Sequence, residues 1–454
     1  MTVVDRIRLA GLLGRERTRF HAEHPGSLAV NRRAGHLFGR VPMTWMTEWS
    51  GGFPLALGSA RGNRITDVDG LTYIDFALGD TGAMAGHSPE PTVRAVTHRM
   101  TTLGGITTML PTEDAEWVGE ELTRRFGLPE WSFTLTATDA NRWAIRLARL
   151  VTGKSKLLVF SYCYHGSVDE TLVIVGHGGL PMSRPGNVAP GVDPRETTRV
   201  VEWNDLAAVE RELAHDDVAA ILMEPALTNI GIVLPAPGFH ESLRALATKY
   251  GALLMIDETH TISAGPGGMT ARDGLRPDIF VIGKSLGGGI PSGAYGLSEE
   301  VAGKVRRITG DAGLGDVGGV GGTLAGNALS MAAMRATLDE VLTETAFARM
   351  IEMATRYTVD VEQILVDIDL PWSIAQLGAR AEYRFVRPGP RDGGESAAAA
   401  DNELDEYMHL YTLNRGILMT PFHNMALMCP DTSAADIDRH SEVFADAVTE
   451  LVGR

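Results

Sequence analysis

A single lysine follows an apolar run in the second half of the chain. In the stretch DIFVIGKSLGGGIPSGAYG (278–296), the apolar run ends at Ile282, and Lys284 comes two residues later. A lysine amine becomes an effective nucleophile or base only when its surroundings activate it. The letters GKS also occur in nucleotide-binding P-loops, but that motif requires a glycine where this chain has Asp278. We therefore exclude a P-loop and look for groups that would accompany Lys284.

Other apolar runs between residues 130 and 300 also end in polar residues. In an open α/β sheet, ligands bind where the carboxyl ends of the parallel strands meet. This edge would collect a hydroxyl-bearing turn, an aromatic residue next to a histidine, and two carboxylates: Thr136-Ala137-Thr138, Tyr164-His165, Glu224 and Asp257. The threonine turn leads into an expected helix, whose free amides and dipole favour a phosphate. The sequence thus predicts a phosphate seat, an aromatic ring, two carboxylates and one lysine at one edge.

Each of these residues also has a simple structural explanation. The threonine turn could be only a helix cap, and Tyr164 could belong to the core. Asp257 follows a buried run, where an unpaired charge is costly, so a cationic group must meet it. If Lys284 is that group, the two form a structural ion pair. If a protonated ring nitrogen meets Asp257 instead, Lys284 is available for covalent chemistry.

A second glycine motif, GLGDVG at 313–318, has the G-x-G-x-x-G spacing of dinucleotide sites. It follows VRRITGDA rather than a clear strand, and it leads into more glycine rather than a helix. Both features are wrong for a dinucleotide fold. We interpret the motif as a glycine-rich loop near a ligand.

Periodicity and turn residues predict the secondary structure around these residues. Short apolar runs alternate with helical patterns from about 130 to 300, which is typical of a mostly parallel α/β sheet. Outside that region we expect a hairpin at 64–76 around Asp69-Gly70, a helix at 324–342 and a strand at 379–386. We also expect a surface connection at 393–401 and a final helix that begins with Ser433 and Asp436 as a capping box. The predicted organisation is an N-terminal segment (1–75) that packs with a small α+β domain (331–454), and a large α/β domain (76–330).

Composition narrows the class of protein. The 454 residues include 41 Lys and Arg against 57 Asp and Glu, a formal charge of −16, which argues against a nucleic-acid partner. The two cysteines, Cys163 and Cys429, have no metal-type spacing, so we expect neither a metal site nor a disulfide framework. No signal peptide and no membrane helix are recognisable. These features favour a cytoplasmic enzyme.

Together, these residues resemble the class III, fold-type I pyridoxal-phosphate (PLP) aminotransferases, and within them the glutamate-1-semialdehyde aminomutase group. The resemblance runs from DVDGLTYIDF (67–76) to the last helix. Its most specific motifs are YHG (164–166), EPALTNIGIVLPAPGF (224–239), MIDE (255–258), GKSLGGGIPSGAYG (283–296) and GGTLAGNALSMAAM (321–334). The resemblance implies a fold-type I transferase, with a large domain around a mostly parallel sheet and a smaller α+β domain. It also implies a homodimer with active sites at the interface.

The resemblance assigns roles to individual residues. Lys284 would carry the cofactor covalently, and Asp257 would keep its pyridinium nitrogen protonated, which makes the ring an electron sink. The remaining cofactor contacts would be the ring neighbours Tyr164, Thr259, His165, Asn229 and Glu224, the phosphate turn Thr136, Ala137 and Thr138, and Thr323, which would reach the phosphate of the neighbouring subunit. Tyr164 would stack on one face of the ring, and Thr259, in place of the usual valine, on the other. A Gly/Pro-rich segment, 176–194, falls where the group has a mobile lid.

The implied reaction is ping-pong transamination through pyridoxamine phosphate, with Lys284 as the base. The substrate side departs from the family. The segment VPMTWMTEW (41–49) lacks the arginine of carboxylate-handling relatives, and only Arg40 lies next to it. The segment 420–430 lacks both the arginine of ornithine-type relatives and the glutamate of true aminomutases.

Trp45 and Trp49 therefore belong either to a dimer interface or to an apolar substrate pocket. We expect an aminotransferase that acts between an amine or amino acid with an apolar group and a keto acid or ketone. The alternatives are an aminomutase of the glutamate-1-semialdehyde type and an amino-acid epimerase. A non-enzymatic binding module is the third, and the retention of both Lys284 and Asp257 disfavours it.

Overall fold

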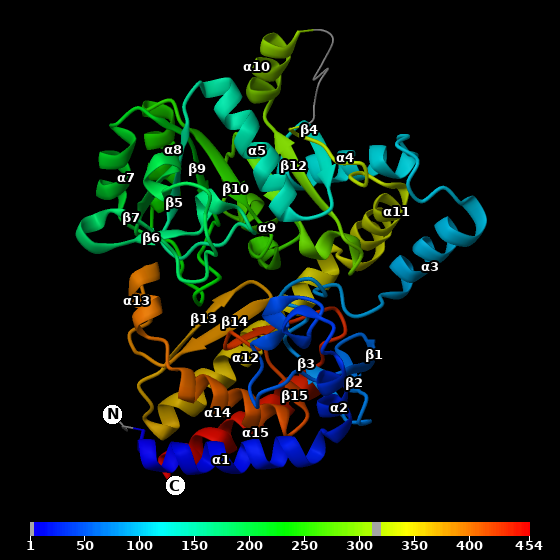
Figure 1. The fold of residues 1–454 in the computed structure, drawn as a ribbon, viewed down its shortest axis with the longest axis vertical. Coiled ribbons are helices and arrows are strands. Elements are labelled where there is room, and N and C mark those ends of the chain that lie inside the picture. Colours follow the sequence, from blue (N-terminus) through cyan, green and yellow to red (C-terminus); the bar gives the residue numbers. More distant parts are fainter. Residues whose placement is uncertain (1–3, 311–318) are drawn as a thin grey trace. The chain divides into compact units, whose positions relative to one another are not determined.

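The computed structural model describes residues 4–310 and 319–454, so the motif GLGDVG (313–318) lies outside the described residues. The chain forms two compact units (Figure 1). The large unit comprises Glu90–Glu344 and Pro390–Ala398. The small unit comprises the chain up to Pro89 together with Thr345–Gly389 and Ala399–Arg454.

The large unit is built around a seven-stranded sheet. The strands in spatial order are β4 (Glu130–Thr134), β12 (Gly293–Leu297), β11 (Ile279–Ile282), β10 (Leu253–Asp257), β9 (Val218–Met223), β5 (Lys156–Phe160) and β8 (Thr198–Val201). All neighbouring pairs are parallel except the two made by β12, which is antiparallel to both β11 and β4. The fold is the predicted α/β class.

The central strands are continuous apolar runs because both faces of a parallel sheet are covered. Every residue of β9, β10 and β11 is buried. The register pairs Asp257 with Val281, so β10 and β11 end close together. The residues that follow the two strands are thereby brought to the same edge.

Helices and short connections complete the large unit. The helices are α3 (Glu90–His98), α4 (Glu113–Phe126), α5 (Ala137–Thr152), α6 (Pro194–Thr197), α7 (Leu206–Leu213), α8 (Phe239–Lys249), α9 (Gly268–Arg272), α10 (Glu299–Thr309), α11 (Ala328–Ala336) and α13 (Gly393–Ala398). Shorter turns are η3 (Arg99–Leu103), η4 (Asp169–Thr171), η5 (His177–Gly179), η6 (Thr261–Ala264), η7 (Lys284–Gly287) and η8 (Thr337–Val341), and β6 (Val173–Val175) pairs with β7 (Pro181–Ser183). An aromatic cluster of Phe160, Trp203 and Phe239 packs one side of the core, with ring centroids 4.6 to 5.9 Å apart.

The small unit combines two sheets with long helices. One sheet has the order β1 (Leu57–Arg61), β2 (Arg64–Asp67), β3 (Thr72–Asp75), β15 (Ile417–Leu418), and the other β13 (Ser373–Leu377), β14 (Arg380–Arg384), β16 (Met425–Leu427). Its helices and turns are α1 (Arg6–Glu23), α2 (Pro25–Arg33), η1 (Phe38–Arg40), η2 (Thr44–Thr47), α12 (Glu344–Ile368), α14 (Asn402–Leu413) and α15 (Ala434–Val452). Within the described part of the chain, none of the helices has the length and apolar content of a membrane span.

Several local predictions are confirmed. The strands β2 and β3 pair antiparallel around Asp69-Gly70, and Gly70 has the positive φ of 86° that this turn needs. The predicted capping box is present at the start of α15, where the Ser433 hydroxyl and the Asp436 carboxylate each accept the other's backbone N–H.

One expectation needs correction. The predicted surface connection at 393–401 contains the helix α13, and its Ser396 hydroxyl donates to the carbonyl of Ile230 in the large unit. The two compact units divide at Pro89–Glu90 and Glu344–Thr345. The predicted domain boundaries, 75–76 and 330–331, stay a prediction. Phe76, next to the first of them, pairs by backbone hydrogen bonds with Leu418 and Leu427 of the small unit.

Candidate active site

Lys284 lies two residues beyond β11, at the first position of η7. Its φ is +51°, in the left-handed region that costs a residue with a side chain about 1–2 kcal/mol. Strain of this kind persists only where the surrounding structure imposes it, and it is common at functional sites. The half-buried side chain places its Nζ 2.8 Å from Nε2 of His260.

Asp257 ends the neighbouring strand and is almost fully buried. Its Oδ2 is 2.9 Å from Nδ1 of His165 and accepts the side-chain amide of Asn141 at 2.8 Å. Its Oδ1 accepts the backbone N–H of Thr259 at 3.0 Å. The cationic partner of this carboxylate in the structure is therefore His165, an outcome that the sequence argument did not consider.

The directions of the two pKa shifts agree with an ion pair between His165 and Asp257. Burial alone would raise the pKa of Asp257, but the hydrogen bond and charge of His165, with help from Asn141, outweigh burial and lower it. Burial likewise disfavours the imidazolium, yet the Cys163 sulfur and the Asp257 carboxylate hold the pKa of His165 well above its usual value. Asp257 is thus kept ionised in a buried site.

The turn Thr136-Ala137-Thr138 opens α5. The Thr136 hydroxyl caps the helix by accepting the N–H of Asp139 at 3.1 Å. The first amides of any α-helix have no partner within the helix, so those before Asp139 point toward a possible ligand. Two glycines let other segments approach this turn. A Cβ on Gly283 would lie 2.9 Å from the backbone nitrogen of Ala137, and one on Gly166 would lie 2.1 Å from Oγ1 of Thr138. The turn is thus closely surrounded by the segments that follow β5 and β11.

The predicted ring neighbours come from the same edge of the sheet. Tyr164 is half-buried, and its backbone N–H donates to Oε1 of Glu224 at 3.3 Å. Glu224 is buried, and its other oxygen accepts the Thr228 hydroxyl. Burial raises the pKa of Glu224. Asn229 is half-buried in the loop after β9, and Thr259 is buried two residues after β10.

The family is decided by sequence comparison. The model of the family described as Aminotransferase class-III matches residues 45–447. This chain belongs to that family.

Relatives and solved structures within the family are similar over nearly the whole chain. The glutamate-1-semialdehyde 2,1-aminomutase of Nitratidesulfovibrio vulgaris (strain DP4) is 36% identical over 408 residues, which cover 88% of this chain and 92% of that protein. A glutamate-1-semialdehyde-aminomutase from Pseudomonas aeruginosa PAO1, solved in complex with PMP, is 46% identical, with a TM-score of 0.95 over 99% of both chains. An omega-transaminase from Sphaerobacter thermophilus is 27% identical, with a TM-score of 0.84 over 94% of this chain and 97% of that one.

The cofactor of this class III aminotransferase is PLP, as predicted, and the fold-type I architecture is confirmed. The residues present fit the cofactor. Among the described residues, His165, Asn141 and the backbone of Thr259 contact Asp257, and the buried, ionised carboxylate suits a pyridinium N–H as a further donor. The start of α5, closely surrounded at Gly283 and Gly166, offers backbone amides to a phosphate. Lys284 lies at the same sheet edge and would supply the amine.

Other predicted site residues lie elsewhere. Thr323 is exposed on the large unit. Arg40, Trp45 and Trp49 belong to the small unit, where Arg40 and Trp45 are exposed and Trp49 is half-buried. The Trp45 ring meets Phe422 edge-on, with centroids 6.0 Å apart. The structure thereby joins the two segments, 41–49 and 420–430, that lack the family's arginine.

Two residues of this site were missed by the sequence analysis. Asn141 stands one turn into α5 and donates to Asp257, and a polar residue among the buried apolar positions of that helix was the available signal. His260 follows Asp257 by three residues, and a histidine so close to a strand end was equally visible. Neither signal indicates which carboxylate or amine the side chain of Asn141 or His260 contacts in the folded protein.

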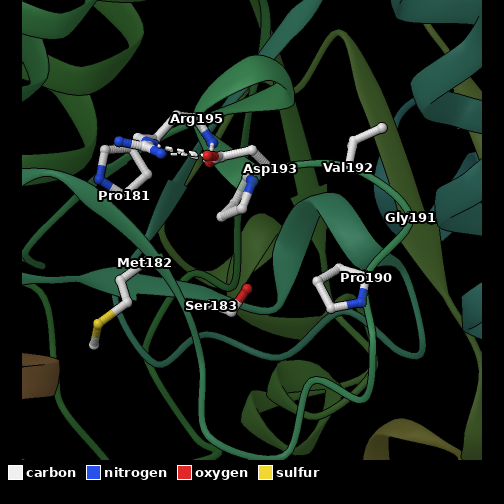
Figure 2. A pocket seen from close by; sticks show the side chains of 9 residues that line it. Pro181, Met182, Ser183, Pro190, Gly191, Val192, Asp193 and Arg195 are labelled. Atoms are coloured by element: carbon white, nitrogen blue, oxygen red, sulfur yellow. Dashed lines mark hydrogen bonds and ion pairs between the residues drawn. The ribbon is translucent and has the colours of Figure 1, made fainter.

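A pocket of about 630 Å³ has a lining that includes none of these residues (Figure 2). It is lined by residues of β7 and of the segment that leads into α6, including Met182, Val192 and the ion pair of Asp193 with Arg195. It falls within the segment 176–194 that was expected to be a lid, and β7 with its partner β6 makes part of that segment a hairpin. None of the predicted site residues lines it, so the strand-end geometry, not this cavity, locates the chemistry. The movement of the lid stays a prediction.

Proposed function

We propose that this protein is a PLP-dependent aminotransferase that moves an amino group between an amine or amino acid with an apolar group and a keto acid or ketone. The observation that carries this proposal is the contact of Trp45 with Phe422. The two segments in which relatives hold a carboxylate partner meet here through aromatic rings, which are 39% and 38% exposed. Exposed aromatic pairs of this kind suit an apolar substrate group better than a carboxylate, which prefers a guanidinium.

The site residues would share the work as follows. Lys284 would accept the proton from the substrate carbon and return it, since its Nζ is the amine that the strand end delivers. Asp257 would hold a negative charge against the cofactor's ring nitrogen, and His165 and Asn141 would keep that carboxylate ionised and oriented. When bound, PLP withdraws electrons from the substrate carbon and so makes its proton removable. Tyr164 and Thr259 would flank the ring, and Glu224 and Asn229 would lie at its hydroxyl side.

The phosphate would be held by the turn Thr136-Ala137-Thr138 at the start of α5. The usual Ser-Gly-Thr-Glu of the family is replaced here, but the hydroxyls and the carboxylate of Asp139 are retained. Because backbone amides do most of the binding at a helix N-terminus, this change leaves the anion site intact.

Single-turnover half-reactions test the proposal. An arylalkyl amine should convert the cofactor to its amine form and release a carbonyl product, followed by absorbance and mass spectrometry. Trp45→Ala should raise KM for that amine about tenfold, because an aromatic side chain that covers a ligand is worth roughly 1.5–3 kcal/mol. Phe38→Ala removes another aromatic ring of the same unit, one that is 87% exposed, and this control variant should behave as the native protein. If none of the amines in a broad panel is converted, transamination is refuted.

A second candidate is an aminomutase, favoured by the similarity to glutamate-1-semialdehyde aminomutases. The same preparation distinguishes the two reactions. Turnover of glutamate-1-semialdehyde without any added amine or carbonyl acceptor would support the mutase. Racemisation of an amino acid under those conditions would instead support an epimerase.

We also propose a homodimer with active sites at the interface. The large unit exposes apolar residues over η3, the loop after it and one later position: Met100, Leu103, Met109, Leu110 and Leu324, each more than half exposed. The backbone hydrogen bond from Ala328 to Ile106 ties these two segments together. Exposed apolar side chains of this kind favour burial against another copy, and Thr323 is next to Leu324 in the chain. Light scattering during gel filtration measures the mass of the assembly, and a monomeric mass would refute the homodimer.

A cytoplasmic location of the protein also stays a prediction.

A further inference from the structure

The amine of Lys284 has a specific neighbour in His260. The two residues follow adjacent parallel strands, β10 and β11, and Nζ lies 2.8 Å from Nε2 of the imidazole. His260 is only 5% exposed, so little water competes for this contact. None of the roles assigned above includes His260.

The position of His260 is set by a buried carboxylate next to Asp257. Glu258 is fully buried, accepts the Thr261 hydroxyl at 2.5 Å and the N–H of Met269 at 3.2 Å, and its carbonyl accepts the N–H of Ile262 at 2.9 Å. The backbone N–H of Glu258 in turn donates to Val281 of β11 at 2.9 Å. The turn that carries His260 is therefore anchored to the strand that delivers Lys284.

The chemistry of the contact limits its protonation. A lysine ammonium has three donors and no acceptor, while a neutral imidazole nitrogen without hydrogen is an acceptor. The hydrogen bond therefore exists with one proton between the two nitrogens and is lost if both groups are cations. For the Lys284 nitrogen to bond to carbon, one N–H bond must break with its electron pair left on nitrogen. Nε2 of His260 is in place to hold that proton and give it back.

We propose that His260 is a positioning residue for Lys284, which orients the free amine and holds its proton while the amine is not bonded to the cofactor. The inference rests on Lys284 being the reactive amine, as proposed above, but not on which substrate the enzyme uses. In this proposal His260 acts on Lys284 and does not touch the cofactor's ring or phosphate.

The test measures covalent capture of PLP by the apoprotein, without any substrate. Capture joins the Lys284 nitrogen to the aldehyde carbon of PLP and releases one water, and stopped-flow absorbance follows its rate. His260→Leu should slow capture about tenfold, the effect of losing one hydrogen bond of about 1.4 kcal/mol. His260→Gln, whose amide can still bond the amine, should stay within about threefold of the native rate.

A second measurement shows whether His260 acts through the lysine. In the Lys284→Ala background, PLP binds without a covalent bond, and adding His260→Leu should change its dissociation constant by less than about twofold. A clear loss of affinity there would mean that His260 touches the cofactor itself and would overturn the proposal. Native capture rates in His260→Leu, or equal slowing in His260→Gln, would overturn it as well. If the leucine variant fails to fold, His260→Phe keeps a ring without the hydrogen bond and carries the same expectation. Because no substrate is present, failure of transamination would leave these outcomes unchanged.

Discussion

Gly283 offers a direct test of how the phosphate turn is built. The residue lies between β11 and Lys284, and a Cβ added there would lie 2.9 Å from the nitrogen and 3.0 Å from the Cβ of Ala137. The backbone of Ala137 cannot rotate away as a flexible side chain would. Gly283→Ala must therefore push the start of α5 away from the sheet edge.

The size of the effect follows from these distances. Carbon atoms prefer separations of about 3.5–4.0 Å, so the turn must move by about half an ångström or more. Overpacking of this kind typically costs about 1–3 kcal/mol. For a protein of 454 residues, whose entropy of unfolding scales with chain length, each kcal/mol lowers Tm by only about 1 °C. A phosphate held by displaced amides would lose about one charge-assisted hydrogen bond, worth roughly 1.5–3 kcal/mol, or about tenfold to hundredfold in PLP affinity.

PLP titration of the apoprotein, together with thermal unfolding, measures both effects. Gly119→Ala is the matched control, because this glycine lies within α4 and an added Cβ there meets nothing within 4 Å. That change should stabilise the protein by about 0.5–1 kcal/mol and leave PLP affinity unchanged. If Gly283→Ala binds PLP as tightly as the native protein, the reasoning that places the phosphate at this turn is wrong.

Two further predictions concern the His165–Asp257 pair and the last helix. Because the pKa of Asp257 is lowered, the contribution of this carboxylate to stability is lost as the pH falls below about 4. Because the pKa of His165 is raised, the contribution of this imidazole is full below about pH 6.5 and is lost at higher pH. The free energy of unfolding of the apoprotein should therefore exceed that of His165→Asn most between about pH 4 and 6.5, and a difference independent of pH in urea titrations would contradict the ion pair. Ser433→Ala removes one half of the capping box of α15 and should cost about 1 kcal/mol in the same assay without changing PLP capture; an unchanged unfolding midpoint would show that the cap contributes nothing.

Local features were predicted well where neighbouring residues decide them. The strand ends at Asp257 and Lys284, the turn at Asp69-Gly70 and the cap at Ser433 all depend on periodicity, turn chemistry and capping within a few residues. The segment 393–401 shows where this reasoning fails. Its small and polar residues suggested a connection, yet part of it is the helix α13, which belongs to the large unit and bonds to the carbonyl of Ile230 there.

Residue types and their order along the chain place these chemical groups at the strand ends, and this was enough to indicate the family and the cofactor. Which groups touch depends on how the segments pack in three dimensions. Asp257 could have met Lys284, but its carboxylate pairs with His165, and the lysine contacts His260. These choices depend on the order β11–β10–β9–β5 in the sheet and on the entry of α5 beside it. Such distances between segments far apart in the chain are set by packing, and no local pattern of residues encodes them.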